Sequence, residues 1–463
     1  MSSRNPLLHG RKRALVHGLG RFGGGREAVR YLAQHGLAVR IADKSAGDDL
    51  QAVRDSLAGL PGLDWQLGRE DEALLDGVDL FVANPGVPDQ NPLLTAAHAR
   101  GLALTQEADL FLAGYPGRVV AVTGTNGKST TSTLLHQALV HSGVDALLGG
   151  NIGHSLLADE AKWRSDQIAV LEISSFQLER MAPTARVHGA VFTRVLKDHV
   201  DRHGTLAAYH AAKGRLGPAA THFVVHAADD AVAQAYATAA PLRLRFAAGS
   251  PGPHGAGVLD GWIALRTGDG PAARIVHEDA LQLLGAFQVE NVMAASLAAR
   301  MVGGTPHGIG MAMATAKPLP FRLQLLATRD GVRIYDNGVS TEVESTRSAL
   351  QALRGRVHWL GGGKSKDGDY RAVADAVVPH VASAHLFGAA AEPLAAAIAG
   401  RVPTTTAARV PAAFAQALAA AAPGDAVLWS PGFASFDQYP NFRARALEFH
   451  ALVGGRAVGA ADG

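Results

Sequence analysis

The sequence predicts an α/β protein of several domains with parallel β-sheets. Its 463 residues are more than one hydrophobic core usually holds, and they predict about three domains of ordinary size. Short apolar segments alternate with longer helical segments, and glycine-containing turns follow several of the apolar segments. This alternation is typical of strand–helix–strand units, which build parallel sheets.

The composition indicates a folded protein and argues against several functional classes. Hydrophobic residues make up 48% of the chain and charged residues 18%. The net charge is +2 and no basic stripe with interleaved aromatic residues is present, so we expect no nucleic-acid partner. The absence of cysteine excludes disulfides and thiolate metal sites and agrees with a reducing compartment.

The N-terminal sequence and the hydropathy pattern indicate the cellular compartment. Charged residues stand where a signal peptide would need its apolar core. No uninterrupted apolar run approaches the roughly 20 residues of a membrane helix. We therefore expect a cytoplasmic protein without a membrane segment.

The first predicted element is a strand over Arg13–His17, followed by the glycine turn Gly18–Gly23. A helix then continues to Gln34, and a second strand over Ala38–Ala42 ends at Asp43. A GxGxxG turn after a strand, with an acid some twenty residues on, is typical of dinucleotide-binding sites. The literal interpretation is NAD, but a UDP-linked substrate satisfies the same geometry, because both offer a diphosphate and a ribose.

A further strand over Leu80–Ala83 runs into the rigid turn Asn84–Pro88. Loops at the carboxyl ends of parallel strands are where open α/β sheets bind ligands. Proline and glycine are also ordinary turn residues, so a plain turn is the alternative. We expect the first domain to close near Glu107.

The central prediction rests on the stretch AVTGTNGKSTT, residues 121–131. A strand over Val119–Val122 runs into a glycine loop, and a helix begins near Lys128. Such a loop directs backbone N–H groups and a helix N-terminus at one point, which suits phosphate groups. Lys128 would reach the β and γ phosphates of a nucleotide and Ser129 would bind Mg²⁺. The Gly124 to Gly127 spacing is shorter than in the usual phosphate loop, and an ordinary capped glycine turn is the alternative.

Three further residues are candidates for a metal–nucleotide site. Glu172 lies within the apolar strand Ala169–Ile173, where an unpaired carboxylate is costly. It predicts either a salt bridge or a Mg²⁺ ligand. His199 follows the predicted strand Ala190–Val195, and Lys213 lies on a helix that begins near Thr205. A solvated histidine and a solvated lysine are the alternatives for these two.

The motifs GTNGKST, GGNIG, LEISSFQLE, DHVDRH with its downstream lysine, and SPGFASFDQYPNF together resemble those of the Mur ligase family, most closely its MurD type. The resemblance spans nearly the whole chain and is weaker in the first domain. It implies an N-terminal Rossmann-like domain for UDP over residues 1–107, a central P-loop ATPase with a parallel sheet over 108–316, and a C-terminal Rossmann-like domain for the incoming amino acid over 317–463.

The resemblance also implies roles for individual residues. The ATP site would comprise Gly124, Thr125, Asn126, Gly127, Lys128, Ser129, Thr130, Asn291, Arg322 and Asp336. The UDP-linked substrate would contact Gly20, Arg21, Phe22, Asp43, Gly86, Asn151 and His199. The incoming glutamate would contact Thr341, Lys366, Ser435 and Phe442. Metal ligands would be Ser129, Glu172, His199 and Lys213, the last if it is carbamylated, and the catalytic residues would be Lys128, His199, Lys213 and Arg322.

Carbamylation would turn the cationic Lys213 into an anion able to bind a second Mg²⁺. The reaction needs a neutral amine, so it requires a lysine whose pKa is depressed by its surroundings.

Two motifs depart from the family pattern. Where the family has GxHNxxN, this chain has Phe287 and Gln288 in place of the histidine and the first asparagine, and it keeps Asn291. Where MurD-type enzymes have DSKATN, it has DNGVSTE from Asp336, and the lysine is missing. The departures fall mostly in the predicted amino-acid pocket.

The sequence therefore predicts an ADP-forming ligase that joins glutamate to UDP-N-acetylmuramoyl-L-alanine, with ATP and Mg²⁺, in the synthesis of peptidoglycan for the cell wall, cell shape and cell division. The changed acceptor motif favours L-glutamate over D-glutamate. A monomer is expected. The alternatives are another Mur or folylpolyglutamate-type ligase, a nicotinamide-dependent oxidoreductase, and a non-catalytic nucleotide-binding regulator.

Overall fold

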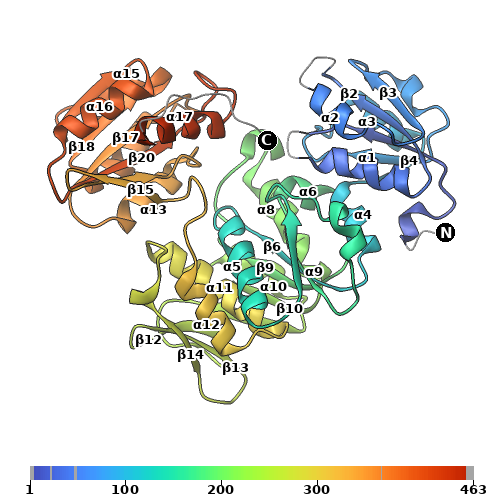
Figure 1. Cartoon of the computed structure of the whole chain (residues 1–463), viewed down its shortest axis with the longest axis horizontal. Helices are drawn as coiled ribbons and strands as arrows, with labels where there is room; N and C mark the ends of the chain where they lie inside the picture. The colour runs from blue at the N-terminus through green and yellow to red at the C-terminus, as the bar shows by residue number, and fades with distance from the viewer. Residues whose placement is uncertain (1–4, 21–22, 46–49, 367, 455–463) are drawn as a thin grey trace. The chain divides into compact units, whose positions relative to one another are not determined.

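The computed structural model describes residues 5–20, 23–45, 50–366 and 368–454 (Figure 1). The chain divides into two compact units, Met1–Ala280 with Glu290–Thr315, and Leu281–Val289 with Ala316–Gly463. Three β-sheets with parallel strands lie in these units, two in the first and one in the second. The predicted α/β class is confirmed.

The first sheet has five parallel strands in the order β3-β2-β1-β4-β5. Because β2 and β4 lie on opposite sides of β1, the turns after β1 and β4 meet at the switch point where such sheets bind ligands. The strands are β1 Arg13–His17, β2 Ala38–Asp43, β3 Leu63–Leu67, β4 Leu80–Ala83 and β5 Ala103–Thr105. The helices are η1 Pro6–Leu8, α1 Gly24–Gln34, α2 Gln51–Ser56, η3 Glu72–Leu75, α3 Pro92–Ala99 and α4 Glu107–Gly114.

The second sheet has nine strands in the order β14-β13-β12-β11-β10-β9-β6-β8-β7, and β12, β13 and β14 pair antiparallel at one edge. Its strands are β6 Arg118–Thr123, β7 Ala146–Gly150, β8 Ile168–Glu172, β9 Val187–Phe192, β10 Ala220–Ala227, β11 Leu242–Phe246, β12 His254–Leu259, β13 Trp262–Thr267 and β14 Ala273–His277.

The helices that accompany this sheet are α5 Lys128–His141, η4 Leu156–Lys162, α6 Ser175–Arg180, α7 Val200–His203, α8 Leu206–Gly214, α9 Leu216–Ala219, α10 Ala231–Ala237, η5 Glu278–Ala280 and α12 Pro306–Thr315. Residues of α11 Ala286–Met301 belong to both units. The strand predicted over Ala190–Val195 begins and ends earlier, as β9. Its continuation leaves the sheet because Thr193 and Arg194 bond to the loop after β6 instead.

The third sheet lies in the second unit and has the strand order β15-β16-β20-β17-β18-β19, with only β15 antiparallel to its neighbour. The stacked rings of Trp429 and Phe449, with centroids 4.8 Å apart, fill the core on one face. The strands are β15 Gln324–Arg329, β16 Val332–Asp336, β17 Val357–Gly362, β18 Ser383–Phe387, β19 Thr404–Ala407 and β20 Ala426–Gly432. The helices are α13 Val343–Ala352, α14 Tyr370–Val377, η6 Val378–His380, η7 Gly388–Ala390, α15 Ala391–Ile398, α16 Val410–Ala420 and α17 Phe442–Gly454.

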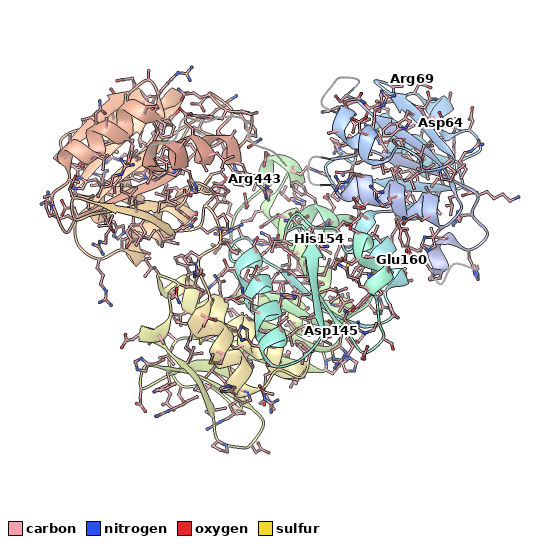
Figure 2. The ribbon with its side chains drawn as sticks, in the orientation of Figure 1. Asp64, Arg69, Asp145, His154, Glu160 and Arg443 are labelled. Atoms are coloured by element: carbon pink, nitrogen blue, oxygen red, sulfur yellow. The ribbon has the colours of Figure 1, made fainter. Side chains whose placement is uncertain are left out.

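The half-buried Asp64 lies on the edge strand β3, and the exposed Arg69 follows that strand (Figure 2). Among the described residues, no helix combines the length and the apolar character that crossing a bilayer requires.

Candidate active site

The predicted phosphate loop connects β6 to α5, as a strand–loop–helix turn. Gly124 has a φ of +150°, and a Cβ there would lie 1.9 Å from Thr193 Oγ1. Gly127 has a φ of +83°, and its Cβ would lie 2.2 Å from Asn291 Oδ1. Both positions therefore require glycine, for backbone conformation and for space. The loop geometry is present despite the short spacing between its glycines.

The loop is held by side chains and backbone from neighbouring elements. Thr125 N donates to the carbonyl of Arg194 over 2.6 Å, and Thr193 Oγ1 donates to the carbonyl of Asn126 over 2.5 Å. The hydroxyls of Thr125 and Tyr209 lie 2.8 Å apart. These bonds fix the loop before any ligand binds, which lowers the cost of ordering it.

Lys128 begins α5, and its side chain returns over the loop. Its Nζ donates to the carbonyl of Gly124 over 3.0 Å and to that of Thr125 over 2.9 Å. The ammonium group thus lies beside the loop's N–H groups and the positive end of the helix dipole, where a phosphate would be stabilised. Ser129 follows in the first turn of the same helix.

Glu172 ends β8, and its side chain is 1% exposed. Its Oε1 accepts a 2.8 Å hydrogen bond from Asn151 Nδ2, while the buried Oε2 has no hydrogen-bond partner among the described residues. A buried carboxylate oxygen without a partner is costly. An oxygen donor of this kind fits Mg²⁺, which prefers carboxylates together with hydroxyls and phosphates. No group of three His, Asp or Glu side chains suited to a metal occurs in the described part of the chain.

His199 lies on the loop after β9 and precedes the first residue of α7, with a left-handed φ of +48°. Its Nε2 lies 3.3 Å from an oxygen of Asp198, and its ring centroid lies 5.0 Å from that of Phe176. The side chain is exposed. A strained backbone at a non-glycine residue is common at functional sites.

Lys213 is the buried cation of this region. Its Nζ donates to the carbonyl of Gly124 over 2.7 Å, beside the phosphate loop. Burial, with a smaller effect from the charge of Lys128, holds the pKa of Lys213 well below its usual range. The alternative of a solvated lysine is therefore wrong. The depressed pKa that the carbamylation hypothesis requires is present, and its main cause is burial.

The two predicted UDP-binding turns meet at the switch point of the first sheet. A Cβ on Gly20 would lie 2.5 Å from Asn84 Nδ2, so the turn after β1 packs directly against the turn after β4. Asp43 Oδ2 accepts from Leu19 N over 2.8 Å, and Gly86 N donates to Asn84 Oδ1 over 2.9 Å. Arg21 and Phe22 lie outside the described residues.

In the second unit, three loops meet at the carboxyl end of the sheet. Gly432 N donates to the carbonyl of Ser340 over 3.2 Å, and Lys364 N donates to that of Ala434 over 2.8 Å. These bonds bring together the turn that carries Thr341, the loop that carries Lys366, and the buried Ser435. The predicted glutamate-binding residues thus come from neighbouring loops, and Phe442 begins α17 just beyond them.

Lys366 and Glu342 form an ion pair within this group of loops. The pair lies at the surface, with Lys366 reaching back to the turn after β16. Glu342 is a carboxylate, so it makes with Lys366 the same kind of ion pair that a substrate carboxylate would make.

Arg322 and Asp336 lie at the start and end of the β15–β16 hairpin. The residues on either side of Arg322 both have left-handed backbone, with φ of +66° at Phe321 and +50° at Leu323. Asp336 is fully buried; its Oδ1 accepts from Gly338 N over 2.7 Å and its Oδ2 lies 2.5 Å from a nitrogen of His450. Burial raises the pKa of Asp336, and the pair with His450 opposes that shift.

Comparison with known protein families decides the identity. The profile of the Mur ligase MurD-like N-terminal domain matches residues 12–106, that of the Mur ligase middle domain matches residues 122–299, and that of the Mur ligase glutamate ligase domain matches residues 321–433. The chain belongs to the Mur ligase family.

Individual Mur ligases support the same assignment. The UDP-N-acetylmuramoylalanine–D-glutamate ligase of Acidobacterium capsulatum is 34% identical over 446 residues, which cover 96% of each chain. The enzyme of the same name from Solibacter usitatus is 34% identical and covers 96% of this chain and 98% of its own.

Solved structures show the same fold at lower identity. A pseudomurein peptide ligase type C from Methanothermus fervidus matches with a TM-score of 0.61 and 17% identity, covering 96% of this chain and 99% of its own. The UDP-N-acetylmuramate–alanine ligase MurC from Thermotoga maritima matches with a TM-score of 0.61 and 14% identity, over 96% and 99% of the two chains.

This Mur ligase is therefore an ATP-dependent amide ligase, as the family resemblance implied. The alternatives of a nicotinamide-dependent oxidoreductase and of a non-catalytic regulator are wrong, because the family match covers all three sheets and includes the phosphate loop. The glycine turn after β1 belongs to the MurD-like N-terminal domain and is no sign of NAD.

Two functional candidates in this Mur ligase escaped the sequence analysis. Arg180, at the end of α6, donates to the carbonyl of Asn84 over 3.0 Å and pairs with Asp89, so it holds the turn after β4. Arg180 directly follows the motif LEISSFQLE, which was the available signal.

Arg445, on α17, is the other. It is 0% exposed; Nη1 donates to the carbonyl of Gly362 over 3.3 Å, while Nε and Nη2 have no hydrogen-bond partner among the described residues. Burial lowers the pKa of Arg445 to about 10. The positive charge of this residue lies directly under the glycine loop after β17, where the glutamate site is predicted.

Proposed function

We propose that this Mur ligase joins glutamate to UDP-N-acetylmuramoyl-L-alanine and converts ATP to ADP and phosphate. The observation that carries the proposal is the full-length similarity to ligases named for this substrate, together with an ordered phosphate loop that has Lys128 over it. Each reacting group has a matching part of the chain. The UDP turns meet in the first sheet, the phosphate loop lies in the second, and the acceptor loops meet in the third.

The proposed chemistry is activation of a carboxylate. A carboxylate oxygen of the UDP substrate attacks the γ-phosphorus of ATP, the bond to the bridging oxygen breaks, and ADP leaves. The amine of glutamate then attacks the acyl carbon, the C–N bond forms, and phosphate leaves as the nitrogen loses a proton. Lys128 and Arg322 neutralise charge as two anions approach, which is the main electrostatic difficulty of the step.

Mg²⁺ would be held by Ser129, Glu172, His199 and, if carbamylated, Lys213. When bound, the ion would neutralise phosphate charge and orient the phosphate oxygens. The buried Oε2 of Glu172 and the depressed pKa of Lys213 support this donor set.

The remaining predicted site residues belong to the same proposal. Asn151 would contact the UDP substrate, while Asn291 and Asp336 would contact the nucleoside of ATP. We also propose that the domain boundaries lie at residues 107 and 316 and that the protein is a cytoplasmic monomer. Its role would be in forming the cell wall during growth and division.

For the enantiomer, the names of the relatives support D-glutamate. The L-glutamate preference that the sequence predicted gains no support from them. It stays a second candidate because of one observation. A Cβ on Gly338 would lie 2.8 Å from Ala446 Cβ and 2.9 Å from Trp429 Nε1, so the turn that carries a lysine in MurD-type enzymes is closed to side chains here.

The test is phosphate release with UDP-N-acetylmuramoyl-L-alanine, ATP and each glutamate enantiomer separately. Release with D-glutamate alone supports the D-specific ligase, and release with L-glutamate alone replaces it with the second candidate. The absence of release with either enantiomer would refute the proposed function, and a panel that includes folate and other UDP-muramoyl acceptors would then identify the ligase.

A further inference from the structure

One face of α17 contacts the β15–β16 hairpin at two places, the segment around Arg322 and the end of β16 at Asp336. Both residues are predicted to take part in the ATP reaction. Phe442, Ala446 and His450 are spaced four residues apart, so they lie on the same side of the helix. Arg443 marks the beginning of this helix in Figure 2. Each of the three residues makes a defined contact with the hairpin.

The first contact joins His450 to Asp336. The His450 Nε2 lies 2.5 Å from Asp336 Oδ2, and the carboxylate is fully buried. A buried carboxylate needs partners on both oxygens, since an unpaired charge is costly in a medium of low polarity. Gly338 N supplies the other partner. His450 is therefore part of what keeps the carboxylate at the end of β16 in its place.

The second contact joins the helix to the turn itself. The space at Gly338 is closed by Ala446 and Trp429, which leaves the backbone of the turn packed directly on α17. The turn also reaches back to the start of the hairpin, because Val339 N donates to the carbonyl of Phe321 over 3.2 Å.

The third contact joins the helix to the segment around Arg322. The ring of Phe321 lies 5.1 Å from the ring of His450 and 6.5 Å from that of Phe442, measured between centroids. Phe321 and Leu323 have left-handed backbone, which non-glycine residues hold only when surrounding contacts stabilise it. The ring of His450 is one of those contacts.

We propose that His450 is a positioning residue of the ligase reaction: it fixes Asp336 and the backbone on either side of Arg322 in one arrangement. It acts through these two groups. The inference rests on the proposed function, because it assigns Arg322 and Asp336 to the ATP reaction. His450 is 28% exposed, so it can be substituted without opening the core on the far side of α17.

The experiment compares His450→Leu with His450→Gln in steady-state phosphate release. Leucine removes the N–H donor, whereas glutamine keeps one. We expect His450→Leu to lower kcat about 10-fold or more, because a hydrogen bond to a buried charge is lost, with the KM for the UDP substrate unchanged. His450→Gln should recover most of that loss. Leu447→Ala, at an exposed position on the same helix, is the matched control and should behave as wild type.

A double-mutant cycle with Asp336→Asn tests the route of the effect. If His450 acts through Asp336, the two substitutions together should lower kcat by less than the product of their separate effects. Wild-type kcat in His450→Leu, equal losses in the leucine and glutamine variants, or fully multiplicative effects with Asp336→Asn would each overturn the inference while leaving the proposed function intact. A wild-type chain that releases no phosphate would remove the proposed function and the inference with it.

Discussion

The phosphate loop of the first unit and the acceptor turn at residues 336–342 of the second unit are built alike and are supported differently. Each follows a parallel strand, and each contains a glycine whose position has no space for a side chain, Gly127 in one and Gly338 in the other. The phosphate loop is braced by segments that follow the next strand of its own sheet, β9. The acceptor turn is also bonded to the neighbouring strand of its sheet, β20, and it has a further support from the helix α17, through a pair that joins residues 114 positions apart.

The difference explains why one site is easy to recognise in the sequence and the other is not. A loop held by its neighbours needs a compact run of residues, and that run is the motif. The sequence of a turn held by a distant helix can change when the helix sequence changes with it. Here the lysine of the family motif is replaced by Gly338, which packs against Ala446 of α17. The two regions should therefore respond differently to substitution.

The largest effect is expected for Lys128→Ala. Its ammonium lies over the loop and would stabilise the charge of the transferred phosphoryl group, so its loss should lower kcat about 10³-fold. Phosphate release under saturating ATP measures it. Lys162→Ala is the control and should leave kcat unchanged, since this exposed lysine forms an ion pair with Asp159 and belongs to none of the predicted sites. A Lys128→Ala variant with more than a tenth of wild-type kcat would contradict the assigned role.

A smaller effect is expected for Gly127→Ala. The substitution combines left-handed strain of about 1–2 kcal/mol with overpacking of about 1–3 kcal/mol against Asn291. ATP affinity, measured by calorimetry, should fall about 100-fold. Gly143→Ala isolates the strain, because φ there is +76° and no described atom lies within 4 Å of the added Cβ. The free energy of unfolding, measured with urea, should fall more in Gly127→Ala than in Gly143→Ala. Equal losses in the two variants would show that the contact with Asn291 costs nothing.

His385, on the strand β18 of the third sheet, offers a pH-dependent comparison. Buried His385 lies 2.7 Å from Ser383 Oγ and 2.9 Å from Thr405 Oγ1, and burial lowers its pKa to about 4. The unfolded chain binds this proton near pH 6.5 and the folded chain only near pH 4. Stability is therefore complete above pH 6.5 and should fall by up to about 3 kcal/mol as pH drops toward 4.

Urea unfolding of wild type and His385→Gln at pH 7 and pH 4.5 measures this. The variant should lose less stability than wild type on acidification. Activity at pH 7 should change little, because His385 contacts Ser383, Thr405 and His358, and none of these is a predicted site residue. An identical acid loss in both chains would show that His385 is not the titrating group.

The smallest effect is expected for Gly338→Ala. The added methyl group would meet Ala446, Trp429 and the carboxylate of Asp336, which costs about 2 kcal/mol of unfolding free energy. Gly454→Ala, where no described atom lies within 4 Å, is the control. Thermal unfolding compares the two. A Gly338→Ala variant as stable as its control would show that the turn can move away from α17, and the comparison of the two regions would lose its basis.

The sequence predicted strands β1, β2, β4, β6 and β8 and the glycine-containing turns after β1, β4 and β6, because each depends on a short run of neighbouring residues. It placed one strand three residues late, since nothing local indicates that Thr193 and Arg194 leave the sheet to bond with Asn126 and Thr125. The burial of Lys213 was not predicted, because an amphipathic helix permits either environment; the family resemblance implied only a lysine whose pKa is depressed by its surroundings.

The long-range supports could not be predicted in the same way. The pair of Asp336 and His450, the contact of Arg180 with the turn after β4, and the buried charge of Arg445 each depend on how helices pack on sheets. No local spacing encodes these contacts. His450 also looks in the sequence like an ordinary residue of a C-terminal helix.

The contact between Gly127 and Asn291 has a consequence for how this protein can change over generations. The asparagine amide occupies the volume that any side chain at position 127 would need. A replacement of the glycine can be accepted only after residue 291 has become smaller, yet residue 291 also accepts a bond from Thr131. Substitutions at these two positions, far apart in the chain, are therefore coupled. If position 127 or position 291 is randomised alone and active variants are selected, almost only the parental residue should be found.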